Sequence, residues 1–189
     1  NARHQGVVAR VAGVELRTSL EDVLAQAQGE ALLLVLDGVQ DLHNLGACLR
    51  VADAFGAHAV VAPKDRAVAL TPAAAKVASG AAEAVPYLRV TNLVRALKQM
   101  QQAGLWIMGA DQEGEAALGP SALDGALAWV LGAEGEGLRR LTREACDRLV
   151  RIPMQGSVES LNVSVAAGIC LYETHPQPRA GLSSKAGGV

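Results

Sequence analysis

The sequence predicts an α/β domain in which a mostly parallel β-sheet is flanked by helices. Half of the 189 residues are hydrophobic but only 3% are aromatic, and such a composition suits close helix–sheet packing within one domain. Apolar runs at 31–36 and 126–131 lack polar alternation, which is typical of strands buried on both faces. Segments of helical spacing separate these runs, so helices are expected to join parallel strands.

In the first half of the chain, capping residues and prolines mark the element boundaries. Ser19 can cap a first helix, the first apolar run ends at Asp37, and Pro63 closes the second run. Thr71 followed by Pro72 is a typical helix start, with threonine as the N-cap. The expected elements are a helix over 20–28, a strand over 31–36, a helix over 44–55, a strand over 57–62, a helix beginning at 71–72 and a strand over 86–90.

In the second half, apolar strands again alternate with helical spacing. The run 126–131 ends at a glycine, and Pro153 stops the strand that follows it. Four arginines near this segment are expected to form a solvated basic surface: Arg139, Arg140, Arg143 and Arg148. The expected elements are a helix over 93–103, a strand over 105–110, a loop over 114–124, a strand over 126–131, a helix over 138–146, a strand over 149–152 and an apolar helix over 161–172.

Charge and cysteine usage exclude several classes of protein. The net charge of −2 does not suggest a strongly basic nucleic-acid-binding domain, so any RNA contact must come from a local basic face or from a part outside this chain. The three cysteines are widely spaced, which argues against a disulfide framework and against zinc. No metal, no membrane partner and a cytoplasmic location are expected, because the sequence has no metal-ligand spacing, membrane-length apolar run or signal peptide.

Three polar or glycine-rich loops follow buried strands, at 37–44, 132–137 and 153–160. Ligands of parallel α/β sheets bind beyond the carboxyl ends of the strands, so these loops are the candidate functional site. The first loop leads into a helix carrying Asn44 and, six residues later, Arg50. Asn44 could be a helix N-cap and Arg50 a solvated charge, or both could belong to a site.

The other two loops carry stronger signals. In 132–137, three glycines in six residues permit positive φ and close ligand approach, although a flexible turn would look the same. This spacing is not the dinucleotide-binding fingerprint, and it follows a late strand. Ser160 could simply cap the last helix. Asn162 and Ser164 are expected inside that helix, where polar groups are costly to bury without partners, which favours a binding role.

Together, these three segments resemble the signature motifs of the SpoU branch of the SPOUT methyltransferases. The motif Asn-x-Gly-x-x-x-Arg is matched over 44–50, Gly-x-Glu-x-x-Gly over 132–137, and Ser-Leu-Asn-Val-Ser over 160–164. The resemblance extends over about residues 1–173. Further stretches are similar to the bacterial members that methylate a guanosine ribose in the peptidyl-transferase region of 23S ribosomal RNA; they lie at 4–9, 37–39, 43–50, 61–66 and 141–144.

The resemblance implies a SPOUT fold with a deep C-terminal trefoil knot, a homodimer, and S-adenosylmethionine as the cofactor. It implies methyl transfer to the ribose 2′-hydroxyl of a guanosine in 23S ribosomal RNA. Backbone groups are expected to hold the cofactor, and an arginine is expected to act on the ribose and phosphate. The implied catalytic residues are Arg50, Asn44, Glu134, Ser160 and Asn162, and the implied cofactor-binding residues are Gly132, Ile152 and Leu161.

The expected organisation is a catalytic domain over 31–173, preceded by a lead-in over 1–30 from an N-terminal RNA-binding domain and followed by a disordered tail over 174–189. Two alternatives stay open: an enzyme of the same branch that acts on tRNA, and a non-catalytic RNA-binding module. A nucleotide-dependent oxidoreductase and a Rossmann-type methyltransferase are disfavoured, because no glycine fingerprint follows the first strand.

Overall fold

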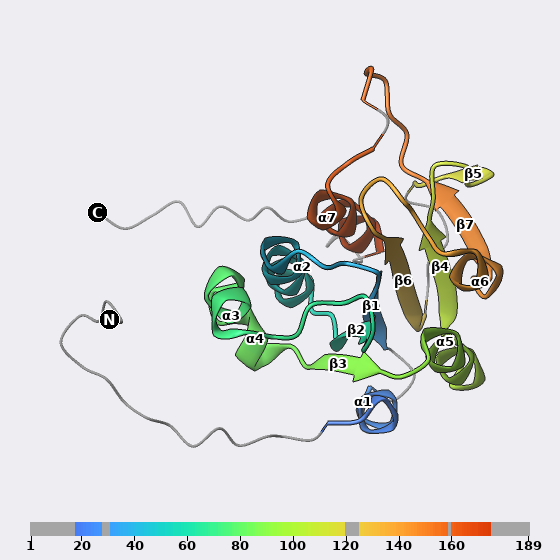
Figure 1. Cartoon of the computed structure of the whole chain (residues 1–189). Coiled ribbons are helices and arrows are strands. Elements are labelled where there is room, and N and C mark those ends of the chain that lie inside the picture. The colour runs from blue at the N-terminus through green and yellow to red at the C-terminus, as the bar shows by residue number, and fades with distance from the viewer. Residues whose placement is uncertain (1–17, 28–30, 120–124, 159, 175–189) are drawn as a thin grey trace, which may run out of the picture.

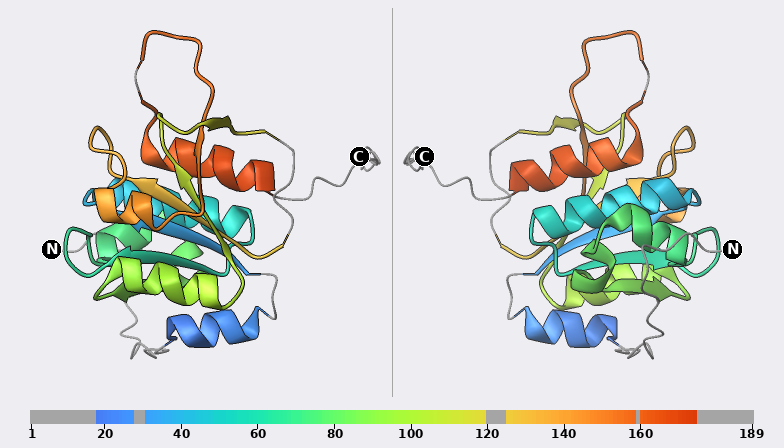
Figure 2. Two further views of the ribbon diagram at one scale, coloured as in Figure 1. Left: turned by 90° about the vertical axis from the view of Figure 1, so that its right-hand side faces the viewer. Right: turned by 90° about the vertical axis from the view of Figure 1, so that its left-hand side faces the viewer.

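The computed structural model describes residues 18–27, 31–119, 125–158 and 160–174. In this part of the chain, a seven-stranded sheet lies between two layers of helices (Figures 1 and 2). The strands are β1 (Leu32–Asp37), β2 (Ala59–Pro63), β3 (Tyr87–Val90), β4 (Trp106–Ala110), β5 (Ala116–Ala117), β6 (Leu127–Gly132) and β7 (Arg148–Arg151). The helices are α1 (Leu20–Gln26), α2 (Leu42–Ala54), α3 (Pro72–Ala78), α4 (Ala81–Ala84), α5 (Leu93–Gln102), α6 (Arg140–Glu144) and α7 (Val163–Thr174).

The two faces of the sheet bury separate cores because successive side chains of a strand point to opposite sides. On the central strand β1, Leu34 and Leu36 face the core under α2, α3, α4 and α7, whereas Leu33 and Val35 face the core under α1 and α5. All four side chains are at most 1% exposed. The absence of polar alternation in this run therefore reflects a strand covered on both faces, as predicted.

The strand order determines where loops can meet. The order is β3-β2-β1-β6-β4-β7-β5, and every pairing is parallel. Strand β6 lies between β1 and β4, although it follows both in the chain. The carboxyl ends of β1, β6, β4 and β7 consequently lie side by side, and the segments that leave them share one edge of the sheet.

The predicted α/β class with a mostly parallel sheet is confirmed, and each predicted strand is present within two residues of its expected bounds. One local expectation was wrong and one element was missed: strand β5 lies within the expected loop over 114–124, and the four-residue helix α4 was not predicted. Short elements of this kind carry too few residues to show a periodic pattern. The predicted apolar helix over 161–172 is present as α7, shifted by two residues.

Part of the expected lead-in over 1–30 and nearly all of the expected tail over 174–189 fall outside the described residues. Among the described helices, none is both long and apolar enough to cross a membrane. The same part of the chain holds no group of three or more His, Cys, Asp or Glu side chains arranged to bind a metal ion.

Candidate functional site

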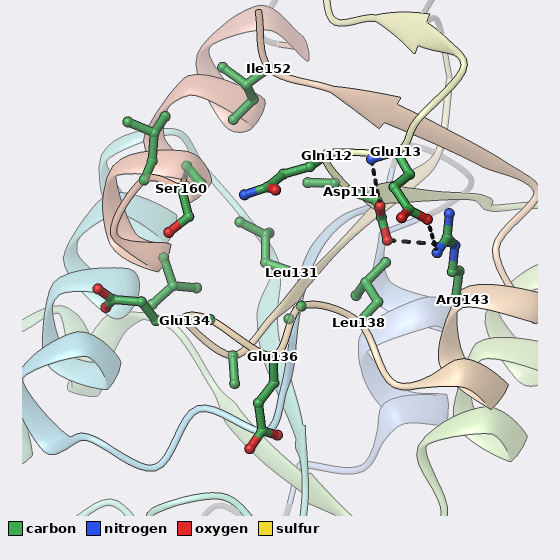
Figure 3. Close-up of a pocket in the computed structure, with 18 residues that line it drawn as sticks. Asp111, Gln112, Glu113, Leu131, Glu134, Glu136, Leu138, Arg143, Ile152 and Ser160 are labelled. Carbon is green, nitrogen blue, oxygen red and sulfur yellow. Dashed lines mark hydrogen bonds and ion pairs between the residues drawn. The ribbon is translucent and has the colours of Figure 1, made fainter. Parts of the chain in front are cut away.

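A pocket of about 350 Å³ opens at the carboxyl edge of the sheet, beyond strands β4, β6 and β7 and beside the start of α7 (Figure 3). The segments that leave β4, β6 and β7, the segment that leads into α7, and one side chain of α6 contribute to it. The lining residues are Ala110–Glu113, Leu131–Leu138, Arg143, Ile152, Ser160, Leu161, Val163 and Ala166.

The predicted site residues divide into two groups. Five of the eight line the pocket: Gly132, Glu134, Ile152, Ser160 and Leu161. The remaining three, Asn44, Arg50 and Asn162, do not line it. The second and third sequence motifs therefore form the pocket, and the first motif lies outside it on α2.

The glycine loop 133–138 folds back on itself directly after β6. The N–H of Gly137 donates to the carbonyl of Ala133 at 2.9 Å, and these two residues form an antiparallel bridge. Gly135 and Gly137 have φ values of +81° and +67°, in the region that favours glycine. A Cβ at Gly132 would lie 2.0 Å from the carbonyl carbon of Gly137, so only glycine fits there. The loop is thus a closed turn with exposed backbone beside the pocket.

The first and third motifs are joined by a hydrogen bond between two asparagines. The Asn162 amide nitrogen donates to the Asn44 amide oxygen at 2.9 Å. The Asn162 amide oxygen accepts from the backbone N–H and the hydroxyl of Ser164, at 2.9 and 2.7 Å. Asn162 therefore precedes α7 and satisfies its first turn, which corrects the expectation that it lies inside the helix and that Ser160 could be the cap.

Helix α2 also starts differently from the simplest expectation. Asp41 is its N-cap and accepts from the N–H groups of His43 and Asn44 at 2.8 Å. Asn44 is thus not the N-cap, and its side chain is available for the bond to α7. Gly46 has a packing role: a Cβ there would lie 2.6 Å from the Cβ of Val77 on α3.

Arg50 lies on the same helix with an exposed side chain. In the described part of the chain, no hydrogen bond or ion pair holds its guanidinium group. It is six residues beyond Asn44, or about 9 Å along the helix axis at 1.5 Å per residue. An unpaired guanidinium of this kind is available to an anionic ligand such as a phosphate.

Sequence reasoning missed one wall of the pocket, formed by the segment after β4. Arg143 donates to Glu113 at 2.7 Å and lies 3.6 Å from the carboxylate of Asp111 (Figure 3). The bond with Glu113 and the charge of Asp111 raise the pKa of Arg143 above its usual value. The signal was present in the sequence, because a polar segment follows a buried strand here as it does at the three loops that were singled out.

The charges on the lining are predominantly negative. Asp111, Glu113, Glu134 and Glu136 place four carboxylates on the lining, against the guanidinium of Arg143. A concave site lined mainly by one sign of charge attracts ligands of the opposite sign. The pocket therefore suits a ligand with a cationic centre.

The three cysteines are not placed for nucleophilic chemistry in this pocket, because none of them lines it. Burial raises the pKa of the Cys48, Cys146 and Cys170 thiols to about 12. A thiol acts as a nucleophile only as the thiolate. The arrangement thus offers no activated thiol beside the pocket.

Comparisons with known proteins agree with this geometry. Residues 31–172 match the model of the SpoU rRNA Methylase family. The chain is 62% identical over 171 residues to the 23S rRNA (guanosine-2'-O-)-methyltransferase RlmB of Ralstonia nicotianae, covering 90% of this chain and 69% of the relative. It is 61% identical over 175 residues to the protein of the same name from Nitrosomonas europaea, covering 93% of this chain and 67% of the relative.

Two solved structures share the fold. The SpoU methyltransferase AviRb from Streptomyces viridochromogenes, in complex with the cofactor AdoMet, matches with a TM-score of 0.73 and 27% identity. The match covers 79% of this chain and 58% of that chain, so the chain spans less than two thirds of AviRb. The A. aeolicus TrmH/SpoU tRNA modifying enzyme matches with a TM-score of 0.69 and 27% identity, covering 84% of this chain and 83% of that chain.

Proposed function

The chain belongs to the SpoU rRNA methylase family, and from this premise we propose that it transfers a methyl group from S-adenosylmethionine to the ribose 2′-hydroxyl of a guanosine in 23S ribosomal RNA. The observation that carries the proposal is the pocket, where a closed glycine loop and a lining of net negative charge lie at the carboxyl edge of the sheet. The relatives at 61–62% identity bear the name of that activity.

The residues at the pocket fit S-adenosylmethionine in charge. The cofactor supplies an electrophilic methyl group on a positively charged sulfonium, which suits the carboxylate-rich lining. Backbone groups of Gly132, Ile152 and Leu161, all on the lining, would hold it. A guanidinium and a phosphate form strong charge-assisted hydrogen bonds, so the RNA backbone is expected to lie along α2 rather than in the acidic pocket.

The ribose hydroxyl has to lose its proton as it attacks, and a free hydroxyl is a poor nucleophile near neutral pH. Arg50 is unsuited to be a literal base because an arginine side chain stays protonated in proteins. Its role in this proposal is to hold the adjacent phosphate and to stabilise the negative charge that develops on the ribose oxygen. The residues that shape the site and orient the ribose are Asn44, Glu134, Ser160 and Asn162.

The direct test is incubation of the chain with isotopically labelled S-adenosylmethionine and either a 23S rRNA fragment or bulk tRNA, followed by mass mapping of the methylated nucleosides. The proposal predicts 2′-O-methylguanosine in the rRNA fragment, with or without a chelator. Methylation of tRNA alone would instead favour the tRNA-modifying alternative. RNA binding with neither cofactor binding nor methyl transfer would leave a non-catalytic RNA-binding module.

Arg50→Ala is expected to slow single-turnover methylation by about a hundredfold, which corresponds to roughly 3 kcal/mol of transition-state stabilisation. Cofactor affinity, measured by calorimetry, should stay near that of the wild type because Arg50 lies outside the pocket. The matched control is Arg95→Ala, which removes an exposed arginine from α5 on the other face of the sheet. Equal loss of cofactor binding in Arg50→Ala would make Arg50 a structural residue.

The proposal includes a homodimer. Helix α7 is apolar on most of its surface, and Val165 and Tyr172 on it are 50% and 51% exposed. A helix that is apolar all round is normally buried, and self-association would cover this face. Sedimentation at micromolar concentration should show a dimer, and Tyr172→Glu should shift it toward monomer. A wild-type chain that sediments only as a monomer would refute this part.

Two further features belong to the same proposal. The first is the domain organisation: residues 31–173 form the catalytic domain, and residues 1–30 lead into it from an RNA-binding domain. The second is the trefoil knot that the family resemblance implies, which lies near the C-terminus. An experimental structure with continuous backbone from β4 through α7 would test whether the last helix threads a loop.

A further inference from the structure

The side chain of Asp37, the last residue of the central strand β1, has no exposed surface. Burying a carboxylate is costly unless charged and hydrogen-bonding partners compensate for the lost water. A fully buried carboxylate at the edge of the sheet that carries the pocket therefore needs a specific partner.

That partner is Arg139, which contacts Asp37 at several points. The Arg139 Nε donates to Oδ1 of Asp37 at 2.6 Å, and the backbone N–H of Arg139 donates to Oδ2 at 3.1 Å. A second guanidinium nitrogen lies 2.5 Å from Oδ1. The Arg139 side chain is 34% exposed, which corrects the expectation that this arginine belongs to a solvated basic surface.

Asp37 also meets the other end of the same loop. In the parallel ladder between β1 and β6, Asp37 is the register partner of Gly132. The residue before the pocket-lining loop 133–138, Gly132, therefore lies beside Asp37 in the sheet. The residue after the loop, Arg139, is hydrogen-bonded to the Asp37 side chain. The Asp37 carboxylate thus holds the Arg139 end of the loop, and the Asp37 backbone pairs with the Gly132 end. The bridge between Ala133 and Gly137 closes the loop internally.

We propose that Asp37 and Arg139 are positioning residues that hold the glycine loop in its cofactor-binding shape before the cofactor arrives. This inference rests on the proposed function of the pocket. A loop that is already ordered loses little conformational entropy on binding, so the pair contributes to cofactor affinity without touching the cofactor. A pair that only supported the fold would change stability and leave the affinity of the folded protein unchanged.

The test compares Arg139→Gln with Arg140→Gln, which removes the neighbouring, exposed arginine that pairs with Glu144. Arg139→Gln is expected to weaken calorimetric affinity for S-adenosylmethionine, and to raise the KM for it, by about tenfold or more, because the loop must order on binding. kcat at saturating cofactor should stay within about threefold, because no reacting group is removed. Arg140→Gln should match the wild type in all three quantities.

Two further variants distinguish the outcomes if Arg139→Gln folds poorly. Arg139→Lys keeps the charge but loses the fork, and is expected to show an intermediate loss of affinity. The double variant Asp37→Asn/Arg139→Gln should lose less affinity than Asp37→Asn and Arg139→Gln lose together. The reason is that the double variant removes both charges, so that no charge is left without its partner. Wild-type affinity in folded Arg139 variants would overturn the inference. Failure of the wild-type chain to bind the cofactor would instead refute the proposed function.

Discussion

Two of the backbone segments that wall the pocket, those after β6 and β7, are held in opposite ways. The loop 133–138 after β6 is bridged internally and fixed to Asp37 at both ends. In the segment 152–161 after β7, no backbone–backbone hydrogen bond involves the described residues, and its middle is exposed, with Val158 63% exposed. Among the described residues, Ile152 packs against the core at its start, and a hydrogen bond between Asn162 and Asn44 follows its end.

This difference indicates that one segment is preorganised for binding and that the other adapts to the ligand. A braced loop presents its backbone groups in one arrangement, so binding to it costs little ordering. Segments with few contacts and exposed backbone open most readily, and they are where ligand-dependent ordering is expected. We therefore expect the loop after β6 to be a fixed wall and the segment after β7 to be the wall that responds to the cofactor.

The largest expected effect is a difference in stability between two glycine-to-alanine substitutions, one on each wall. In Gly132→Ala the new Cβ would lie 2.0 Å from backbone, and the loop has no room to shift. We expect a loss of more than about 3 kcal/mol in the free energy of unfolding, in urea titrations. In Gly156→Ala on the other wall, the Cβ meets open space, and the change should stay within about 0.5 kcal/mol. Equal effects at the two positions would abolish the contrast between the walls.

Hydrogen exchange measures the contrast without a substitution. S-adenosylmethionine at about one hundred times its Kd should slow amide exchange across 153–158 by about tenfold or more, because binding suppresses opening. Exchange across 133–138 should be slow already and change by less than about threefold. Helix α1, on the opposite face of the sheet, serves as the internal reference. Protection confined to the glycine loop would reverse the assignment of fixed and responsive walls.

A smaller effect is expected where the responsive wall ends. Asn162→Ala removes the cap of α7 and should cost about 1 kcal/mol of stability together with the bond to Asn44. Asn162→Asp keeps an acceptor for Ser164 but loses the donor to Asn44. It should therefore recover the stability, measured by thermal unfolding, but not the methylation rate.

The matched control for Asn162 is Asn92→Ala, which removes the N-cap of α5 on the other face of the sheet. It should lower stability by a similar amount, about 1 kcal/mol, and leave methyl transfer unchanged. Recovery of both stability and rate in Asn162→Asp would assign Asn162 to helix capping alone.

The smallest effect concerns the thiols behind the two walls, Cys146 after α6 and Cys170 on α7. Burial raises the pKa of each to about 12, from 9.0 for an ordinary thiol. The folded state thus keeps protons that the unfolded chain releases, so this stability is intact well below pH 9, begins to fall near pH 8 and is lost as the pH rises through 9 toward 12. For Cys170, urea unfolding should show a loss of roughly a few tenths of a kcal/mol between pH 8 and 9, and Cys170→Ala should lack that part of the slope.

Much of this molecule could be predicted from local sequence. The apolar runs at 31–36 and 126–131 gave β1 and β6 within one residue, because a strand covered on both faces needs apolar side chains at every position. The glycines of 132–137 were expected to permit positive φ, and Gly135 and Gly137 have it. Gly132 lines the pocket. Capping was harder to predict: Asp41 and Asn162, rather than Asn44 and Ser160, satisfy the starts of α2 and α7.

The sequence by itself determined the class of fold, the order of its elements and the residues able to form a site, since these depend on side chains within a few positions of each other. Only the tertiary structure decided how those residues are grouped. Asp37 and Arg139 are 102 positions apart, and Asn44 and Asn162 are 118 apart. Both pairs meet because segments distant in the chain come together at one edge of the sheet, with β6 seated between β1 and β4. Strand order follows from packing of the whole chain, so the partner of a buried carboxylate is a property of the assembled sheet.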